Sequence, residues 1–387
     1  MPLFSLAAAL LLAQTPPPAA DAPPAAQVAP VAAQPAPPTM PMPVDSKPLP
    51  APFAAKVTPY GFMNFQYSRL YPSPPKPGVN TFEFRRARLG LKGDVTPNVA
   101  FNVIYDGADS ALKDAWVTLK GLPGVEARLG QFKTPFGYEQ QESDTKLLWL
   151  NNSYIVAALA RGKDSRDEGA IVNGRWTLGP VALDAATAYV NGAGPNAKDD
   201  LDDKGVWARA GVATTILGVT PRLGLSYGYG HQVASLGTDA KLGLQGSGAT
   251  ATFDDTTFYF HAAGLDLTVD SPWFFAVFED IQSRRHVTKH TNPTTLAVTN
   301  VVPKGWYAGV YGKTPWNLGP VLRLEEARLP TSGANGLNAR YNERATLGAY
   351  YDVAPLNARF VANYEWDRSP RAIRTGNRLV LFAQVMY

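Results

Sequence analysis

The chain has 387 residues, no cysteine and a formal net charge of +4, with a pI near 9.0. The lack of cysteine excludes a disulfide framework, a thiolate metal site and a cysteine nucleophile. The positive excess contains no long block of like charge, which argues against nucleic-acid binding, and the 34 Gly, 34 Pro and 17 Tyr indicate many short strands and turns.

The N-terminus has the pattern of a targeting segment. Residues 3–13, LFSLAAALLLA, form an apolar run too short to span a bilayer as a helix. We therefore expect residues 1–13 to be a secretory signal peptide; the alternative is an apolar, disordered start, because no Lys or Arg precedes the run. Residues 14–57 are rich in proline and almost free of aromatic residues, which predicts a disordered linker, with a tether across the periplasm or to the cell wall as the alternative.

From residue 58 to residue 387 the sequence alternates with a period of two, and we treat this part as one domain. In residues 86–92, RARLGLK, the basic side chains fall on one face and Ala and Leu on the other. Such regular alternation predicts β-strands. The same alternation recurs in residues 99–106, 114–120, 125–130, 181–189, 345–351, 356–362 and 379–387.

Short turns containing Pro or Gly alternate with connections that are mostly longer and more polar. Hairpins around the short turns give about sixteen antiparallel strands, with both chain ends at the short-turn rim. This is the pattern of a bacterial outer-membrane β-barrel. The short turns lie at residues 94–98, 121–124, 178–181, 217–221, 270–272, 314–320 and 354–356.

The alternative is a soluble β-sandwich with the same alternation. Sixteen strands with polar inward faces would leave a soluble protein without a filled interior, whereas a barrel of this size encloses water. We therefore predict an all-β, 16-stranded antiparallel transmembrane barrel in the Gram-negative outer membrane, with short periplasmic turns and long extracellular loops. Aromatic residues suited to a membrane-interface girdle lie near strand ends: Tyr60, Tyr105, Tyr189, Tyr364 and Trp366.

Three segments resemble the phosphate-selective porin O and P family in both content and order. They are residues 81–93, TFEFRRARLGLKG, residues 128–139, RLGQFKTPFGYE, and residues 166–174, RDEGAIVNG. The last ten residues, RLVLFAQVMY, are similar to the C-terminal strand of outer-membrane proteins, with Tyr387 where Phe is commoner. The resemblance covers residues 60–387 and implies a sixteen-stranded, anion-preferring channel, usually a homotrimer, with a basic ladder along the lumen.

Strand parity assigns basic side chains to the lumen. An Arg or Lys that faced lipid at the bilayer midplane would cost about 2 to 4 kcal/mol, so Arg86 and Arg88 are assigned to the water-filled side. Arg85 has the other parity and is expected at a bulge or at the rim. A ladder of cations lowers the barrier for anions, and the planar Arg fork suits phosphate. The predicted anion path consists of Arg86, Arg88, Lys92, Lys120, Arg128, Lys133, Arg166 and Arg209.

Acidic residues share this inward row, so the alternative is that the cations are ordinary lumen charges paired with their neighbours. A mixed lumen gives weaker selectivity than a basic one. The inward acidic residues are Asp106, Asp114, Glu126, Asp184, Asp352 and Glu365.

Residues 134–166 form the longest connection. Ordered loops of this length are usually functional, and the apolar centre LLWLNNSYIVAALA, residues 147–160, would be unusual on an exposed loop. We predict that the loop folds into the barrel and narrows it, with Lys146, Arg161 and Lys163 at the constriction. The alternative is packing on the rim or on a neighbouring subunit.

No catalytic residue, cofactor or metal site is expected. The spacing of His286 and His290 would suit a metal only on a helix, and they fall in a Thr- and Val-rich segment. The acidic loop 191–204 is expected to be a solvated surface loop, with divalent-ion binding as the alternative.

These features predict a passive diffusion channel for small anions such as phosphate or polyphosphate. The expected partners are small anions, outer-membrane lipid, lipopolysaccharide and two further copies of the chain in a homotrimer, with no nucleic acid. The alternatives are a non-selective or structural outer-membrane barrel and, third, an outer-membrane hydrolase.

Overall fold

The computed structural model describes residues 56–73, 77–159, 165–199, 202–234, 256–289, 300–331, 338–370 and 374–387. The expected signal peptide, and all but the last two residues of the expected linker, lie outside these ranges. Residues Pro50–Tyr387 belong to one compact unit. Across the described ranges, we find no helix that is long and apolar enough to cross a membrane.

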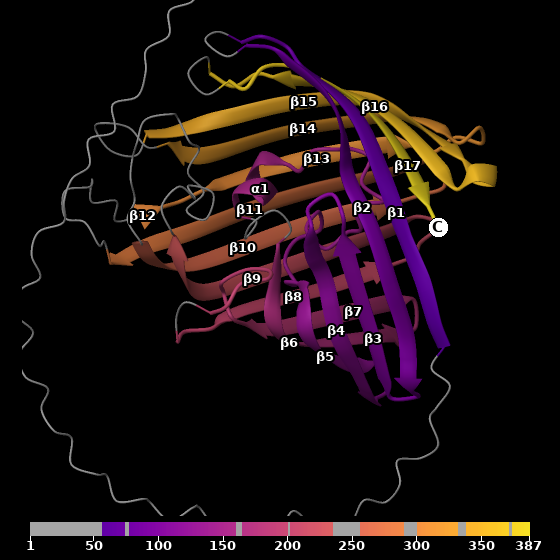
Figure 1. Cartoon of the computed structure of the whole chain (residues 1–387), viewed down its shortest axis with the longest axis vertical. Helices are drawn as coiled ribbons and strands as arrows, with labels where there is room; N and C mark the ends of the chain where they lie inside the picture. The colour runs from indigo at the N-terminus through magenta and orange to yellow at the C-terminus, as the bar shows by residue number, and fades with distance from the viewer. Residues whose placement is uncertain are drawn as a thin grey trace, which may run out of the picture. The chain divides into compact units, whose positions relative to one another are not determined.

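The strands form one antiparallel sheet that closes on itself, because β1 pairs with both β2 and β17 (Figure 1). Of the 17 strands, β12 and β13 both pair with β11 and make a single crossing interrupted at Val302 and Pro303, so the predicted 16-stranded barrel is confirmed. The strands are β1 (Lys56–Leu70), β2 (Val79–Thr96), β3 (Val99–Asp106), β4 (Ala111–Leu122), β5 (Val125–Lys133), β6 (Arg166–Leu178), β7 (Val181–Val190), β8 (Gly205–Thr214), β9 (Thr220–Ala234), β10 (Thr256–Asp270), β11 (Phe274–Lys289), β12 (Asn300–Val301), β13 (Lys304–Gly312), β14 (Leu318–Thr331), β15 (Asn338–Val353), β16 (Ala358–Asp367) and β17 (Arg378–Met386).

The seven predicted short turns all connect consecutive strands at one rim of the barrel. The connections at the other rim include residues 134–165, by far the longest stretch between two strands. Both ends of the sheet, the start of β1 and the end of β17, lie at the short-turn rim, as predicted.

Side chains alternate between the outside of the barrel and its interior. On β16, Phe360 and Trp366 are 49% and 40% exposed, whereas Val361 and Glu365 are each only 3% exposed. The period-two pattern of the sequence therefore marks the two faces of the wall. Many of the buried inward side chains are polar or charged, which makes them the natural candidates for a functional site.

A β-bulge in β2 lies within the FEFRRAR segment. Asn64 of β1 pairs with Arg86, but the next residue, Phe65, pairs with Phe84, so Arg85 is the extra residue. A bulge re-aims side chains relative to the regular pleat. The register shift confirms the bulge expected at Arg85. Arg85 and Arg86 both donate hydrogen bonds to the connection between β5 and β6, to Asn151 and Asp144.

Candidate functional site: the lumen and its inner loop

The connection between β5 and β6, residues 134–165, runs through the interior of the barrel; we call it the inner loop. Its short helix α1 (Tyr154–Leu159) contacts β11, β13 and β14, across the lumen from β5 (Figure 1). The buried Trp149 ring lies 6.4 Å from the ring of Tyr307 and 6.5 Å from that of Tyr311, both on β13. The predicted inward folding of this loop is therefore confirmed.

Glu279 of β11 holds the first part of the inner loop. Its carboxylate accepts hydrogen bonds from the backbone N–H of Tyr138 at 3.0 Å and of Glu139 at 3.2 Å, and from the hydroxyl of Tyr307 at 2.7 Å. Glu279 is fully buried. A buried backbone N–H group outside a helix or strand still needs a hydrogen-bond acceptor. Here the side chain of Glu279, on the barrel wall, is that acceptor.

Further wall side chains hold the second part of the inner loop by its backbone. Glu325 of β14 accepts from the N–H of Tyr154 at 2.6 Å, and the amide of Asn363 on β16 donates to the carbonyl of Leu148 at 3.0 Å. These contacts are spread along the loop, so its path is fixed at several points.

Glu139 is a loop carboxylate turned into the buried interface. Its Oε1 accepts from the backbone N–H of Ser153 at 2.9 Å, which ties two parts of the inner loop together. Burial raises the pKa of Glu139, and the attraction of Arg323 opposes this only in part.

Asp144 of the inner loop meets the predicted basic row. Arg86 Nε lies 3.0 Å from Asp144 Oδ2, and Arg88 Nη1 lies 2.6 Å from the same oxygen. Arg88 Nε also pairs with Asp106 at 2.9 Å. Burial acts to raise the pKa of Asp144, but the nearby charges of Arg86, Lys133 and Arg88 outweigh it and hold this pKa well below its usual range.

Two cations of the predicted path are buried in ion pairs. Arg166 is 2% exposed and its Nε lies 2.7 Å from Asp114 Oδ1. Arg209 is 9% exposed and pairs with both carboxylate oxygens of Asp266. Their charges are compensated inside the wall, so a passing solute would meet them only at a distance.

Two more predicted cations lie nearer the short-turn rim, each with a carboxylate partner. Lys120 pairs with Asp94 at 3.0 Å, and both side chains are largely exposed. Arg128 pairs with Glu126, and its guanidinium carbon lies 5.1 Å from the centre of the Trp116 ring.

The remaining predicted cations are lysines and loop residues. The Lys92 side chain is exposed, and its Nζ lies 5.0 Å from the centre of the Tyr60 ring. Lys133 donates to the carbonyl of Glu142 at 2.7 Å, and Lys146 pairs with the Glu142 carboxylate at 3.2 Å. Two predicted constriction residues lie outside the described ranges: Arg161 and Lys163.

The lumen is thus a wall of ion pairs rather than a row of free cations. Most of the predicted lumen cations therefore fit the alternative interpretation, in which they pair with neighbouring carboxylates. Each of the six predicted inward carboxylates pairs with an arginine: Asp106 with Arg88, Asp114 with Arg166, Glu126 with Arg128, Asp184 with Arg222, Asp352 with Arg359 and Glu365 with Arg344.

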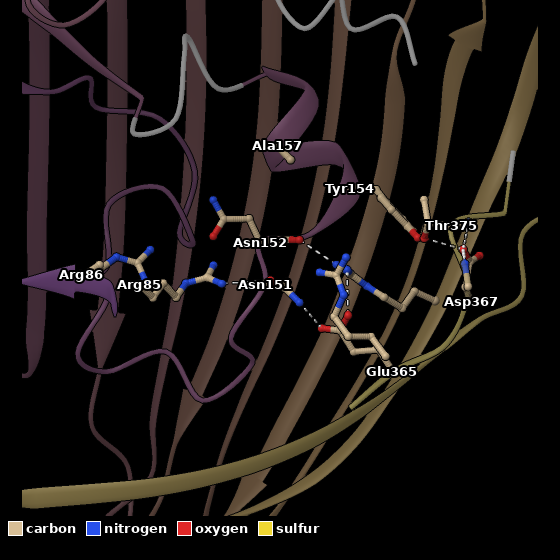
Figure 2. A pocket seen from close by; sticks show the side chains of 12 residues that line it. Arg85, Arg86, Asn151, Asn152, Tyr154, Ala157, Glu365, Asp367 and Thr375 are labelled. Carbon is tan, nitrogen blue, oxygen red and sulfur yellow. Dashed lines mark hydrogen bonds and ion pairs between the residues drawn. The ribbon is translucent and has the colours of Figure 1, made fainter. Parts of the chain in front are cut away.

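An opening remains between the inner loop and strands β2, β15, β16 and β17 (Figure 2). This cavity has a volume of about 370 Å³. At its wall, Arg85 Nη1 donates to Asn151 Oδ1 at 3.2 Å, and Asn151 in turn donates to Glu365 at 2.8 Å. Four arginines and two carboxylates are among the lining residues: Arg85, Arg86, Arg344, Arg378, Glu365 and Asp367.

Sequence reasoning missed several of the residues that shape this site. Arg344 of β15 donates to the carbonyl of Asn152 at 2.7 Å and also pairs with Glu325 and Glu365. Arg344 directly precedes the outward Ala345, so parity alone could have found it. A second bulge, in β4, shifts the register by one residue, so strand parity could not predict the buried position of Lys113.

The acidic loop and the histidines form no metal site among the residues that can be described. Asp199 pairs with Lys204, and Asp203 lies 2.8 Å from Nδ1 of His231. Two predicted members of these groups, Asp200 and His290, lie outside the described ranges.

Comparison with known protein families also indicates a porin. Residues 62–232 match the family model of phosphate-selective porin O and P. No curated protein sequence matches the chain.

Solved structures share the fold at low sequence identity. A loop L8 deletion mutant of OmpT, an outer membrane protein of Vibrio cholerae, is 14% identical with a TM-score of 0.61, over 87% of this chain and 100% of that one. An anion-selective porin from Comamonas acidovorans is 12% identical with a TM-score of 0.58, over 86% and 100%. Salmonella typhi OmpF in complex with daunomycin is 11% identical with a TM-score of 0.55, over 86% and 97%.

The resemblance drawn from the sequence motifs is therefore confirmed over the N-terminal half of the barrel. Family match and fold together point to a channel rather than to an enzyme, and they place the barrel in the outer membrane. Residues 62–232 are thus similar to the phosphate-selective porin O and P family, and the chain is an outer-membrane β-barrel with the fold of known porins.

Proposed function

We propose that this channel passes small anions by diffusion and prefers them to cations, with inorganic phosphate or polyphosphate as the first substrates to test. The observation that carries the proposal is the pair Arg85 and Arg378. Both line the same cavity, and neither forms an ion pair within the part of the chain that the structure describes. An arginine without a carboxylate partner attracts anions, and its fork can bind two oxygens at once.

Two further cations extend the proposed path toward the periplasmic rim. Lys92 of β2 and Arg175 of β6 have inward parity and exposed side chains. Neither forms an ion pair with a described carboxylate. Several weak sites in series would let an anion enter and leave again, as conduction requires.

The paired charges limit how strong this preference can be. Arg166 and Arg209 sit in buried ion pairs, so they contribute little net field to the lumen. We therefore propose that the anion preference is moderate and depends on the few unpaired cations. The predicted anion path as a whole would not produce a strong positive field. A non-selective channel is the nearest alternative.

We further propose that the chain assembles as a homotrimer. The similar OmpT of Vibrio cholerae has been solved in a trimer form, and the present chain covers 100% of that chain at a TM-score of 0.57. Mass photometry of the purified protein tests this, and a monomer would contradict it.

Single-channel recording in planar bilayers tests the preference. A reversal potential measured across a KCl gradient should show anion preference, and added phosphate should reduce the chloride current. The double variant Arg85→Gln/Arg378→Gln should move the reversal potential toward that of a non-selective pore. The matched control is Arg69→Gln, which removes an exposed arginine of outward parity on β1 and should leave the potential unchanged. Cation preference in the unaltered protein would overturn the proposal.

A further inference from the structure

Two basic side chains lie directly opposite each other on the outside of the barrel. Lys304 of β13 and Arg328 of β14 are register partners, and both are exposed. Directly opposed side chains on antiparallel strands have Cβ atoms roughly 4.5 to 5.5 Å apart, and like charges there are destabilising. Neither forms an ion pair with a described carboxylate, so the two charges are left without an anion between them.

The surroundings of this pair are those of a membrane interface. Toward the short-turn rim, the next outward row consists of Asp280, Trp306 and Glu326, and the row after it is apolar, with Phe278, Ala308 and Leu324. Trp306 lies two residues from Lys304 and stacks on Phe278 with a centroid distance of 6.4 Å. Aromatic residues with one polar end favour the boundary between acyl chains and headgroups.

A third cation extends the basic cluster away from the apolar rows. Gln282 of β11 is the register partner of Lys304, and Arg284 follows two residues further toward the long-loop rim. Arg284 is exposed and also lacks an ion pair within the described residues. We call Arg284, Lys304 and Arg328 the outer basic cluster.

Two carboxylates lie one row away from the outer basic cluster; Asp280 attracts Lys304 but forms no ion pair with it. Asp280 and Glu326 are the register partners of Trp306, on the strands either side of it. They are two residues along the strand from the row of Lys304 and Arg328, which is roughly 7 Å. The space between Lys304 and Arg328 is therefore open to an external anion.

We propose that the outer basic cluster binds a phosphate group on the headgroup of an outer-leaflet lipid. The long-loop rim of an outer-membrane barrel faces the outside of the cell, so the cluster lies at the level of the outer leaflet. The guanidinium of Arg328 binds two phosphate oxygens, and the ammonium of Lys304 binds as a point charge. The acyl chains of the same lipid cover the apolar rows below, which a free phosphate ion would leave bare. This inference does not depend on the anion preference of the lumen.

Native mass spectrometry of the purified full-length protein tests the proposal. The probe is lipopolysaccharide, compared with the same lipopolysaccharide after removal of its lipid A phosphates. The variant Lys304→Gln/Arg328→Gln should bind intact lipopolysaccharide about thirtyfold more weakly, since each basic residue at an anionic lipid surface is worth roughly a fivefold change. Arg69→Gln, on β1, should bind as the unaltered protein does.

The swapped variant Lys304→Arg/Arg328→Lys should retain binding, because it keeps both charges. Heat-modifiable gel mobility confirms that each variant still forms a barrel. Equal binding of intact and dephosphorylated lipopolysaccharide, or equal binding by the double glutamine variant, would overturn the proposal. A change of oligomeric state in the double variant would also overturn it, because the cluster would then belong to a contact with a second copy of the chain.

Discussion

Asp144 Oδ2 lies 2.6 Å from Nη1 of Arg88. A carboxylate of the inner loop thus occupies the fork of an arginine that strand parity assigns to the lumen. Arg86 holds the same carboxylate, and Arg88 also holds Asp106. The arginines of FEFRRARLGLKG therefore fasten the loop that narrows the lumen, and Asp144 and Asp106 balance the charges of Arg86 and Arg88.

Replacement of Asp144 by Asn should strengthen anion preference. The change keeps the size of the side chain, removes one negative charge and leaves Arg86 and Arg88 with one carboxylate partner fewer. The reversal potential across a KCl gradient measures the effect. Glu126→Gln makes the same charge change at a pair in which both side chains are 32% exposed, so water screens it and the shift should be smaller. An unchanged potential in the Asp144 variant would contradict this reasoning.

Acid should weaken the attachment of the inner loop to the barrel wall, because Asp144 becomes protonated and its ion pairs are lost. Because the pKa of Asp144 is lowered, its stabilising contribution is fully present above the ordinary Asp pKa of about 3.9 and is lost as the pH falls through the lowered value. Glu139 acts in the opposite sense, since burial raises its pKa and its contribution is lost as the pH rises. Open-channel noise should not increase between neutral pH and about pH 4, because protonation of Glu139 favours the buried loop there, and it should increase below about pH 4 as Asp144 becomes protonated.

The variant Asp144→Asn is the control for this acid effect. It lacks the titrating group, so its noise should already be raised at neutral pH and should show no further acid step. An acid step of the same size in both proteins would assign the effect to another group.

Trp149→Ala should free the inner loop while the barrel persists. Trp149 is 2% exposed and lies between the loop and β13, and truncation of such a buried Trp costs about 3 to 5 kcal/mol. The expected results are protease cleavage within residues 134–165, higher conductance and unchanged heat-modifiable mobility. Trp176→Ala removes an outward Trp that is 42% exposed, and its loop should resist protease like that of the unaltered protein. Loss of the folded band in the Trp149 variant would show that the barrel itself depends on this contact.

Gly137→Ala should displace the loop segment held by Glu279. Gly137 has a φ of 64°, and a Cβ there would lie 2.0 Å from Glu279 Oε1. Gly179 is a matched control, because its φ of 60° is nearly the same and a Cβ meets nothing within 4 Å. Both variants carry the left-handed backbone penalty of about 1 to 2 kcal/mol, but only Gly137→Ala should increase protease cleavage of the inner loop. Similar cleavage in the two variants would exclude the clash as the cause.

Strand parity and the series of short turns in the sequence were enough to predict the barrel and its strand number, and parity assigned Arg86, Arg88 and Arg128 to the lumen. It could not give the partners of these cations. An ion pair between Arg166 and Asp114 joins residues 52 positions apart, and nothing in the local pattern links them. The bulge at Arg85 could be predicted because Arg85 and Arg86 are adjacent and have opposite parity. The residues around Lys113 show no comparable pattern.

By itself, the sequence determined that this chain builds a barrel wall with an apolar outside and a polar inside, because a period of two is a local property of a pleated strand. It also indicated that the connection after β5 is too apolar to remain in solvent. Only the tertiary structure decided which lumen charges are neutralised. That depends on which side chains the closed sheet and the inner loop bring within a few ångströms, and so on contacts such as Asn151 with Glu365, between residues 214 positions apart in the chain.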